Sequence, residues 1–257
     1  MGFPNVRAAE EPAEIDALER RVQAARVSAL ARGCLPVLED FGIAVLSSRV
    51  VWARDLGALD NLVKDENVLY VSFQRQRRGG TRIPASNKWD RGRTAVEATI
   101  HPNYEEEINY AALSLNEAGV LAWGAYQVLL KDKLIESRTT FLEENPFLLC
   151  ERHTVVAGQA PPHGYRSTWN SRHKLAMAKL HDRLNDRTTR TDYPAILLRQ
   201  GSSTGDADFI EAHIYGEMHR SIIEKVKGPR PKSGADRVLW RSIERALKAL
   251  GVALEEL

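Results

Sequence analysis

The sequence has 257 residues, of which 43% are hydrophobic and 27% charged, so it is long enough to bury a large core. Its 36 lysines and arginines nearly balance 34 aspartates and glutamates, so the net charge of +2 gives no ground for inferring nucleic-acid binding. No apolar run reaches the roughly 18 residues that span a membrane, and no secretory signal peptide is recognisable. Cys34 and Cys150 lack metal-ligand spacing, so we expect free thiols and a cytoplasmic location.

The first 66 residues predict a helical region. Residues 11–32 form an amphipathic pattern, with Pro12 in the first turn and Leu18 and Val22 at helical spacing. A second apolar stretch covers 35–46, and residues 49–63 are expected to be another helix or a pair of helices. Such a region is typical of a scaffold or of a partner-binding surface.

Alternation of polar and apolar residues over 68–75 predicts a strand with Ser72 on its polar face, a candidate ligand surface. Arg75 begins a basic segment, 75–82, whose two adjacent glycines allow the backbone to bend around an anionic ligand. A solvated basic loop is the alternative interpretation.

In the middle of the chain we expect a short strand at 94–100, a helix at 105–117, a central strand at 123–130 and a turn-strand segment at 134–141. The central strand carries Tyr126. Arg138 and Thr139 end the turn-strand segment, where a guanidinium and hydroxyl groups can bind a phosphate or a carboxylate. An ion pair from Arg138 to Glu143 or Glu144 is an equally good interpretation.

The second half begins with a short strand at 147–150. A long polar loop at 157–169 follows, in which Arg166 accompanies an imidazole, a phenol and hydroxyl groups. We then expect a basic amphipathic helix at 171–185 and two strands, at 195–199 and 209–215, joined by a hairpin loop at 200–206. A linker at 228–234 and a last helix at 236–250, capped by Asp236, complete the expected elements.

The strand at 209–215 carries the strongest functional signal. Alternation places Ile210, Ala212 and Ile214 on a core face and Glu211 with His213 on the other. A carboxylate beside aromatic rings tends toward a raised pKa, and a neighbouring imidazole can exchange its proton near neutrality. We expect this pair to line a concave, ligand-sized hollow as catalytic residues; a pair on a solvated sheet face is the alternative.

These elements predict an α+β fold: a curved, mostly antiparallel sheet flanked by helices, with a helical N-terminal region. The expected division is a helical region at 1–66, a catalytic α+β domain at 67–227, and a linker with a C-terminal helix at 228–257. Seven scattered histidines lack the spacing of a zinc site, so no metal is expected.

Several short motifs follow one another along the chain: residues 69–74 (Leu-Tyr-Val-Ser-Phe-Gln), 109–116 (Asn-Tyr-Ala-Ala-Leu-Ser-Leu-Asn), 123–131, 138–141, 209–216 and 222–226. Together they resemble an uncharacterised bacterial family found among toxin-like domains, and the last strand segment also resembles the closing strand of ADP-ribosyltransferases. The resemblance implies NAD as a substrate, with Glu211 stabilising an oxocarbenium-like transition state as nicotinamide leaves. It also implies that Ser72 or Arg75 holds the cofactor, and that Tyr126, Arg138 and His213 line the pocket.

The function expected from this resemblance is a transferase or glycohydrolase-like enzyme acting on a nucleotide such as NAD, with a protein or a nucleic acid as a candidate acceptor. A metal-independent ribonuclease is the second hypothesis, with Glu211 as base, His213 as acid and Arg138 or Arg166 facing the phosphate. In-line displacement favours catalytic groups on opposite sides of the phosphate, which argues against two groups on one strand. A noncatalytic binding module, with the N-terminal helices as its partner surface, is the third.

Overall fold

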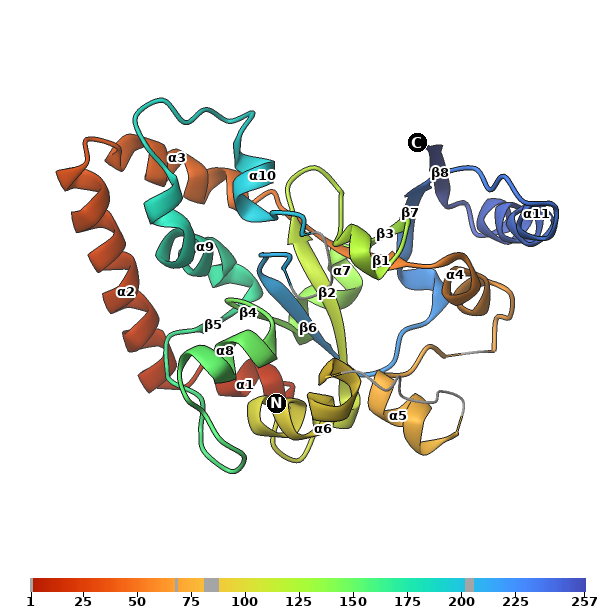
Figure 1. Ribbon diagram of the computed structural model, residues 1–257, viewed down its shortest axis with the longest axis horizontal. Coiled ribbons are helices and arrows are strands. Elements are labelled where there is room, and N and C mark those ends of the chain that lie inside the picture. Colours follow the sequence, from red (N-terminus) through yellow and green to blue (C-terminus); the bar gives the residue numbers. More distant parts are fainter. Residues whose placement is uncertain (1, 68, 81–87, 202–205) are drawn as a thin grey trace.

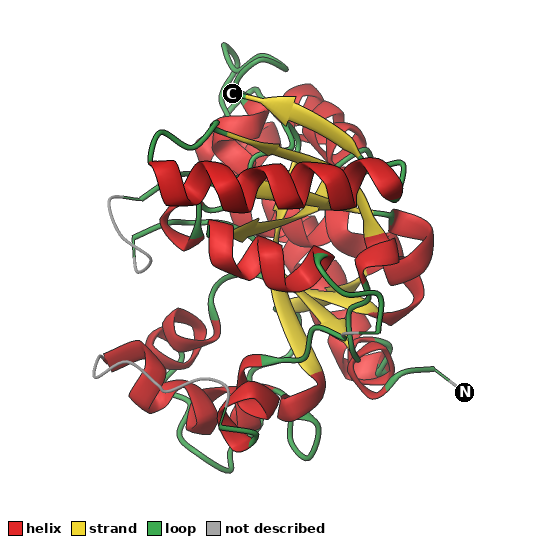
Figure 2. Ribbon diagram, turned by 90° about the vertical axis from the view of Figure 1, so that its right-hand side faces the viewer, coloured by secondary structure: helices red, strands yellow, loops and turns green. Residues whose placement is uncertain are grey.

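The computed structural model describes residues 2–67, 69–80, 88–201 and 206–257, and only the backbone of 88–91. It has the expected α+β fold, in which a mostly antiparallel, eight-stranded sheet lies among helices (Figure 1). Viewed from the side, helices lie in front of and behind most of the strands (Figure 2). Within the described residues, no helix has the length and apolar character needed to cross a membrane.

The strand order across the sheet is β5-β4-β6-β2-β1-β3-β7-β8, and only β7 and β8 pair in parallel within the described residues. The strands are β1 (Arg49–Arg54), β2 (Ile108–Ser114), β3 (Tyr126–Leu130), β4 (Thr139–Leu142), β5 (Arg166–Thr168), β6 (Glu211–Tyr215), β7 (Ile223–Gly228) and β8 (Ala253–Glu256). The strand that carries Glu211 and His213 therefore lies inside the sheet, between β4 and β2.

The helices differ widely in length. They are α1 (Pro4–Ala9), α2 (Pro12–Ala31), α3 (Leu35–Val45), α4 (Leu56–Val63), α5 (Phe73–Arg78), α6 (Lys88–Ile100), α7 (Asp132–Ile135), α8 (Pro146–Arg152), α9 (Arg172–Leu180), α10 (Tyr193–Leu197) and α11 (Gly234–Ala249). Short 3₁₀ turns cover Glu105–Glu107, Leu121–Trp123, Glu136–Arg138, Trp169–Ser171, His181–Arg183 and Arg220–Ile222.

The helix expected at 11–32 is confirmed as α2. Proline occupies its first turn, and Gly33, with a φ of 71°, follows its end in the left-handed conformation that glycine adopts without strain. Leu18 and Val22 are buried, as expected, whereas Ile15 is 50% exposed and lies outside the core-facing stripe.

The prediction of helix throughout 49–63 is wrong for its first half, which forms β1. Val51 and Trp52 are fully buried because β1 is central and covered on both faces, so its sequence shows no alternation that would mark a strand. Asp55 then caps α4 by accepting a 2.7 Å hydrogen bond from the backbone N–H of Ala58. Residues 1–66 are therefore not wholly helical, because they contribute β1 to the sheet.

Three further expectations between 68 and 117 are wrong. In the predicted strand 68–75, Tyr70 forms an isolated bridge with Met218, and Ser72 caps the helix α5. The expected strand at 94–100 belongs to α6, and much of the expected helix at 105–117 is β2. Val68 and residues 81–82 lie outside the described residues.

Later elements are confirmed in part. The strands expected at 123–130 and 209–215 are present as the shorter β3 and β6, and the helix expected at 171–185 contains α9. The strands expected at 147–150 and 195–199 are wrong, because these residues lie in or directly beside α8 and α10. Ser233, not Asp236, caps α11 by accepting a hydrogen bond from the Asp236 N–H. Of the expected hairpin loop, residues 202–205 are not described.

The two faces of the sheet are buried differently. The face that includes Ile210, Ala212 and Ile214 packs into one large apolar core with α2, α3, α4, α9 and α11, which confirms this half of the predicted alternation. The opposite face has two smaller apolar clusters, one around Phe209 and one that joins Leu142 to α6 and α8. Polar side chains occupy part of this second face.

Candidate functional site

Strand pairing fixes which side chains share the second face of the sheet. On β2, Tyr110 lies opposite His213 of β6 and Ala112 lies opposite Glu211. On the other side, Thr140 of β4 pairs with His213. Because directly paired residues point to the same face of a sheet, Tyr110, Glu211 and His213 form one polar row.

A chain of hydrogen bonds runs from Glu211 through His213 to His101. The Nε2 atom of His213 lies 3.2 Å from Oε2 of Glu211, and its Nδ1 atom lies 2.7 Å from Nε2 of His101, which directly follows α6. The residues are almost inaccessible, with exposed fractions of 2% for Glu211, 1% for His213 and 2% for His101. The expectation that this pair lines an open hollow is therefore wrong, because helix α6 and its neighbours cover this face.

The protonation state of His101 follows from its surroundings. Burial lowers the pKa of His101 well below its ordinary value, and His213 and Arg166 lower it further, so His101 is neutral at pH 7. A neutral imidazole carries one N–H, so one of the two ring nitrogens in the 2.7 Å contact between His101 and His213 donates and the other accepts. Nδ1 of His101 has no hydrogen-bond partner among the described residues.

Helix α6 supplies a second carboxylate to this face. Glu97, 3% exposed, accepts a 2.7 Å hydrogen bond from Nε2 of Gln74 and pairs with the guanidinium of Arg93 one turn earlier. Burial raises the pKa of Glu97 even though Arg93 and Gln74 lower it, and the charge of Glu211 adds to the rise. A carboxyl group with a raised pKa is suited to proton transfer near neutrality.

Aromatic rings complete the surroundings. The guanidinium of Arg93 lies 4.4 Å from the ring centre of Phe73 and 5.2 Å from that of Tyr110. Burial raises the pKa of Tyr110 well above its ordinary value, and Glu97 adds to this effect. We call the set that joins α5, α6, β2 and β6 the buried polar layer: Gln74, Arg93, Glu97, His101, Tyr110, Glu211 and His213.

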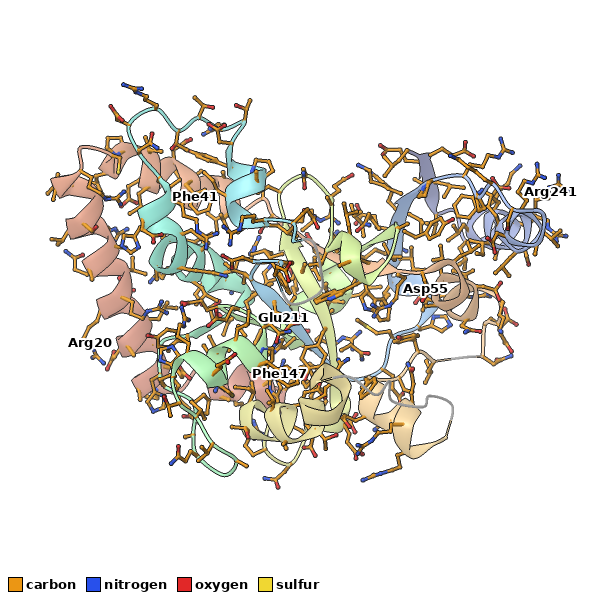
Figure 3. All side chains as sticks on the ribbon, viewed as in Figure 1. Arg20, Phe41, Asp55, Phe147, Glu211 and Arg241 are labelled. Atoms are coloured by element: carbon orange, nitrogen blue, oxygen red, sulfur yellow. The ribbon has the colours of Figure 1, made fainter. Side chains whose placement is uncertain are left out.

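Helix α6 lies close to α8 over this layer. A Cβ atom on Gly92 would lie 2.8 Å from the ring of Phe147, so this close approach requires glycine. Figure 3 shows Glu211 near the middle of the molecule, with Phe147 beside it in this view.

The other predicted site residues do not join the buried polar layer. The hydroxyl of Ser72 donates to the backbone carbonyl of Glu106, and Arg75 pairs with Glu107 and Glu217. The guanidinium of Arg138 donates to the backbone carbonyls of Tyr215, Glu217 and Leu134, and Thr139 donates to that of Ile135. Their hydrogen bonds hold loops and strand ends in place.

Tyr126 and Arg166 also lie elsewhere. The ring of Tyr126 packs 5.2 Å from that of Trp240, at the other end of the sheet. Arg166 pairs with Glu14 at 2.8 Å, although its charge still contributes to the lowered pKa of His101. The alternative ion pair of Arg138 with Glu143 or Glu144 is not formed; Arg152 pairs with both carboxylates.

A scan against protein-family models finds no match, and a search of curated proteins finds no significantly similar sequence. Within the described residues, no group of three or more histidine, cysteine, aspartate or glutamate side chains is arranged to hold a metal ion.

Sequence reasoning missed Arg93, Glu97, His101 and Tyr110. The signal for the first two was available, because Arg93 and Glu97 are four residues apart and such opposite charges stabilise a helix. His101 lies 112 residues from His213 in the sequence, and only the tertiary fold brings these two rings together.

Proposed function

We propose that this protein is an enzyme that cleaves or transfers at the glycosidic bond of a nucleotide such as NAD, with Glu211 as its essential carboxylate. The observation that supports this proposal is the chain from Glu211 through His213 to His101, buried beside a second carboxylate, Glu97. Buried ionisable groups with perturbed pKa values cluster at functional sites.

The charge balance of the buried polar layer suits this reaction. Two carboxylates, Glu97 and Glu211, face one guanidinium, that of Arg93, so a cation is favoured there. When the bond from C1′ of the ribose to the nicotinamide nitrogen breaks, its electron pair leaves with nicotinamide and positive charge develops on the ribose. A carboxylate held by preorganised hydrogen bonds stabilises that charge.

The second half of the reaction needs a base. Water or an acceptor nucleophile attacks C1′ and releases a proton, which Glu97, with its raised pKa, can accept. Because Glu211 is 2% exposed, substrate binding requires α6 to move away from β2 and β6. That movement would carry Arg93, Glu97 and His101 together.

The relative positions of Glu211 and His213 favour glycosidic chemistry over RNA cleavage. The two side chains are hydrogen-bonded neighbours on one strand, whereas in-line displacement at phosphorus favours an acid and a base on opposite sides. Arg138 and Arg166, the arginines considered for a phosphate, already have partners. Arg138 donates to the backbone carbonyl of Tyr215, and Arg166 pairs with Glu14.

The test is release of nicotinamide from NAD by the purified chain. Glu211→Gln keeps the size and the acceptor oxygen but removes the charge, so we expect a loss of rate of about 100-fold or more. Glu143→Gln is the matched control, since Glu143 is 1% exposed and paired with Arg21 and Arg152 outside the buried polar layer. Nicotinamide release that survives Glu211→Gln, or no release by the wild type, contradicts the proposal; degradation of RNA in the presence of a chelator would support the ribonuclease instead.

A further inference from the structure

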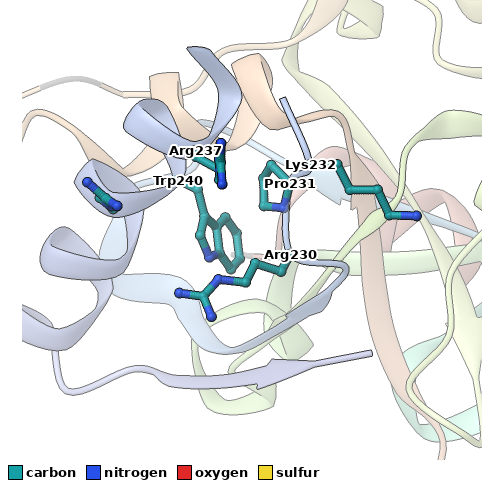
Figure 4. A pocket seen from close by; sticks show the side chains of 6 residues that line it. Arg230, Pro231, Lys232, Arg237 and Trp240 are labelled. Carbon is teal, nitrogen blue, oxygen red and sulfur yellow. The ribbon is translucent and has the colours of Figure 1, made fainter. Parts of the chain in front are cut away.

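A hollow lies at the opposite end of the sheet from β5, between the segment after β7 and helix α11. It is a pocket of about 490 Å³, within the size range of small-molecule sites. Its lining residues are Arg230, Pro231, Lys232, Arg237, Trp240 and Arg241 (Figure 4). We call it the basic pocket; none of its residues belongs to the buried polar layer.

Four of the six lining residues are cations, and few carboxylates balance them. Arg230 is 3.9 Å from the carboxylate of Glu256, and its side chain is 67% exposed. Within the described part of the chain, Lys232, Arg237 and Arg241 have no carboxylate within 4 Å. Their mutual repulsion is therefore relieved mainly by solvent or by a bound anion.

Trp240 adds a fixed hydrogen-bond donor. Its side chain is 1% exposed, yet its indole N–H has no hydrogen-bond partner among the described residues. In Figure 4 the nitrogen-bearing edge of the ring is turned toward Arg230, and the indole ring centre lies 5.2 Å from that of Tyr126. A buried, unpaired N–H is costly, and an acceptor oxygen in the pocket would satisfy it.

We propose that the basic pocket binds a compact anion that carries clustered phosphate groups. Arginine guanidinium groups bind phosphate oxygens in pairs, and the indole N–H supplies one further donor. The buried indole offers a donor edge and leaves little ring surface for a base to stack on, which disfavours a single-stranded nucleic acid. A free polyphosphate and the phosphorylated headgroup of a membrane lipid share this chemistry.

The experiment measures binding of inositol hexakisphosphate by calorimetry, and of vesicles with and without phosphatidylinositol bisphosphate by co-sedimentation. We expect the double variant Arg237→Gln, Arg241→Gln to bind the hexakisphosphate at least about tenfold more weakly. Trp240→Phe keeps an aromatic ring but removes the N–H, so a weakening of about threefold or more is expected. Unfolding temperatures of both variants show whether they are folded.

The matched control is Arg245→Gln with Lys248→Gln, which removes two charges from the same helix outside the pocket. We expect this control and Glu211→Gln to bind as the wild type does. Binding of both the free compound and the phosphorylated vesicles supports recognition of the headgroup chemistry; binding of the free compound alone supports a soluble ligand.

Three results would overturn the proposal. The first is failure of the wild type to bind the free hexakisphosphate, whatever the vesicles do. The second is an equal loss in the pocket and control double variants, which would indicate diffuse attraction to the helix. The third is a short DNA duplex that binds more tightly than the hexakisphosphate and is weakened equally by both double variants.

Discussion

The buried polar layer and the basic pocket hold their charges in opposite ways. In the layer, Glu97 and Glu211 are almost inaccessible and are bound by Arg93, Gln74 and His213. In the pocket, three of the four cations have no carboxylate within 4 Å among the described residues. Figure 3 shows the two regions apart, with Glu211 near the middle of the molecule and Arg241 at its edge.

The charged groups of the two regions therefore have different kinds of partner. Groups of the layer depend on one another, so removing one of them leaves another buried without a partner. Cations of the pocket depend on solvent or on a ligand, so removing one should change binding more than folding. Stability measurements on matched variants can therefore test whether the two regions differ as described.

The largest effect is expected for His213→Leu. This change leaves the carboxyl group of Glu211 buried without its hydrogen-bond partner, so we expect a loss of about 3 kcal/mol in the free energy of unfolding. Urea denaturation measures it. His163→Leu, in which the side chain is 49% exposed, should lose less than about 1 kcal/mol. Equal losses in the two variants would contradict the difference between buried and exposed sites.

An intermediate effect is expected from the lowered pKa of His101. Below about pH 6.5 the unfolded chain gains a proton at this residue that the folded chain does not bind, so stability falls as the pH falls. The contribution approaches about 1.4 kcal/mol per pH unit until the lowered folded pKa is reached. Urea denaturation between pH 7.5 and about pH 5 checks it.

The variant His101→Gln isolates this contribution. A glutamine amide can still hydrogen-bond to His213 but does not titrate, so the stability of the variant should depend less steeply on pH in this range. Glu97, whose raised pKa acts in the opposite direction, and His153, whose lowered pKa acts in the same direction, are present in both proteins. Identical slopes for the wild type and the variant would refute the assignment of the slope to His101.

The smallest effect on folding is expected in the basic pocket. Replacing Arg237 and Arg241 by glutamine removes two cations that lack carboxylate partners among the described residues, so the free energy of unfolding should change by less than about 0.5 kcal/mol. The same urea series measures it. A loss comparable to that of His213→Leu would mean that these guanidinium groups are structural.

Local sequence patterns predicted some elements well and failed at others for identifiable reasons. Alternation identified β6 because one of its faces packs in the apolar core while the other is polar. It failed for β1, where burial on both faces removes the alternation. Around Ser72 the alternation predicted a strand, whereas Ser72 caps α5. A short run of alternating residues also fits the first turn of a helix.

Only the part of the candidate site that is formed by residues close together in the sequence was predictable. Glu211 and His213 are two residues apart, and the strand period alone places them on one face. Glu97 and His101 reach that face through the packing of α6 against β2 and β6, which no local pattern encodes. Arg138 and Arg166 were chosen for their chemistry, but the fold uses their guanidinium groups to bind carbonyls and Glu14.

The place of β6 in the sheet has a consequence for how the molecule assembles. Its neighbours, β4 and β2, come from residues 139–142 and 108–114, so their facing edges have no strand between them until residue 215 has been synthesised. Such unpaired edges are sites of aggregation, and pairings distant in sequence form slowly. A nascent chain halted before this strand would therefore expose two unpaired strand edges, whereas insertion of the strand pairs both edges and brings His213 to His101.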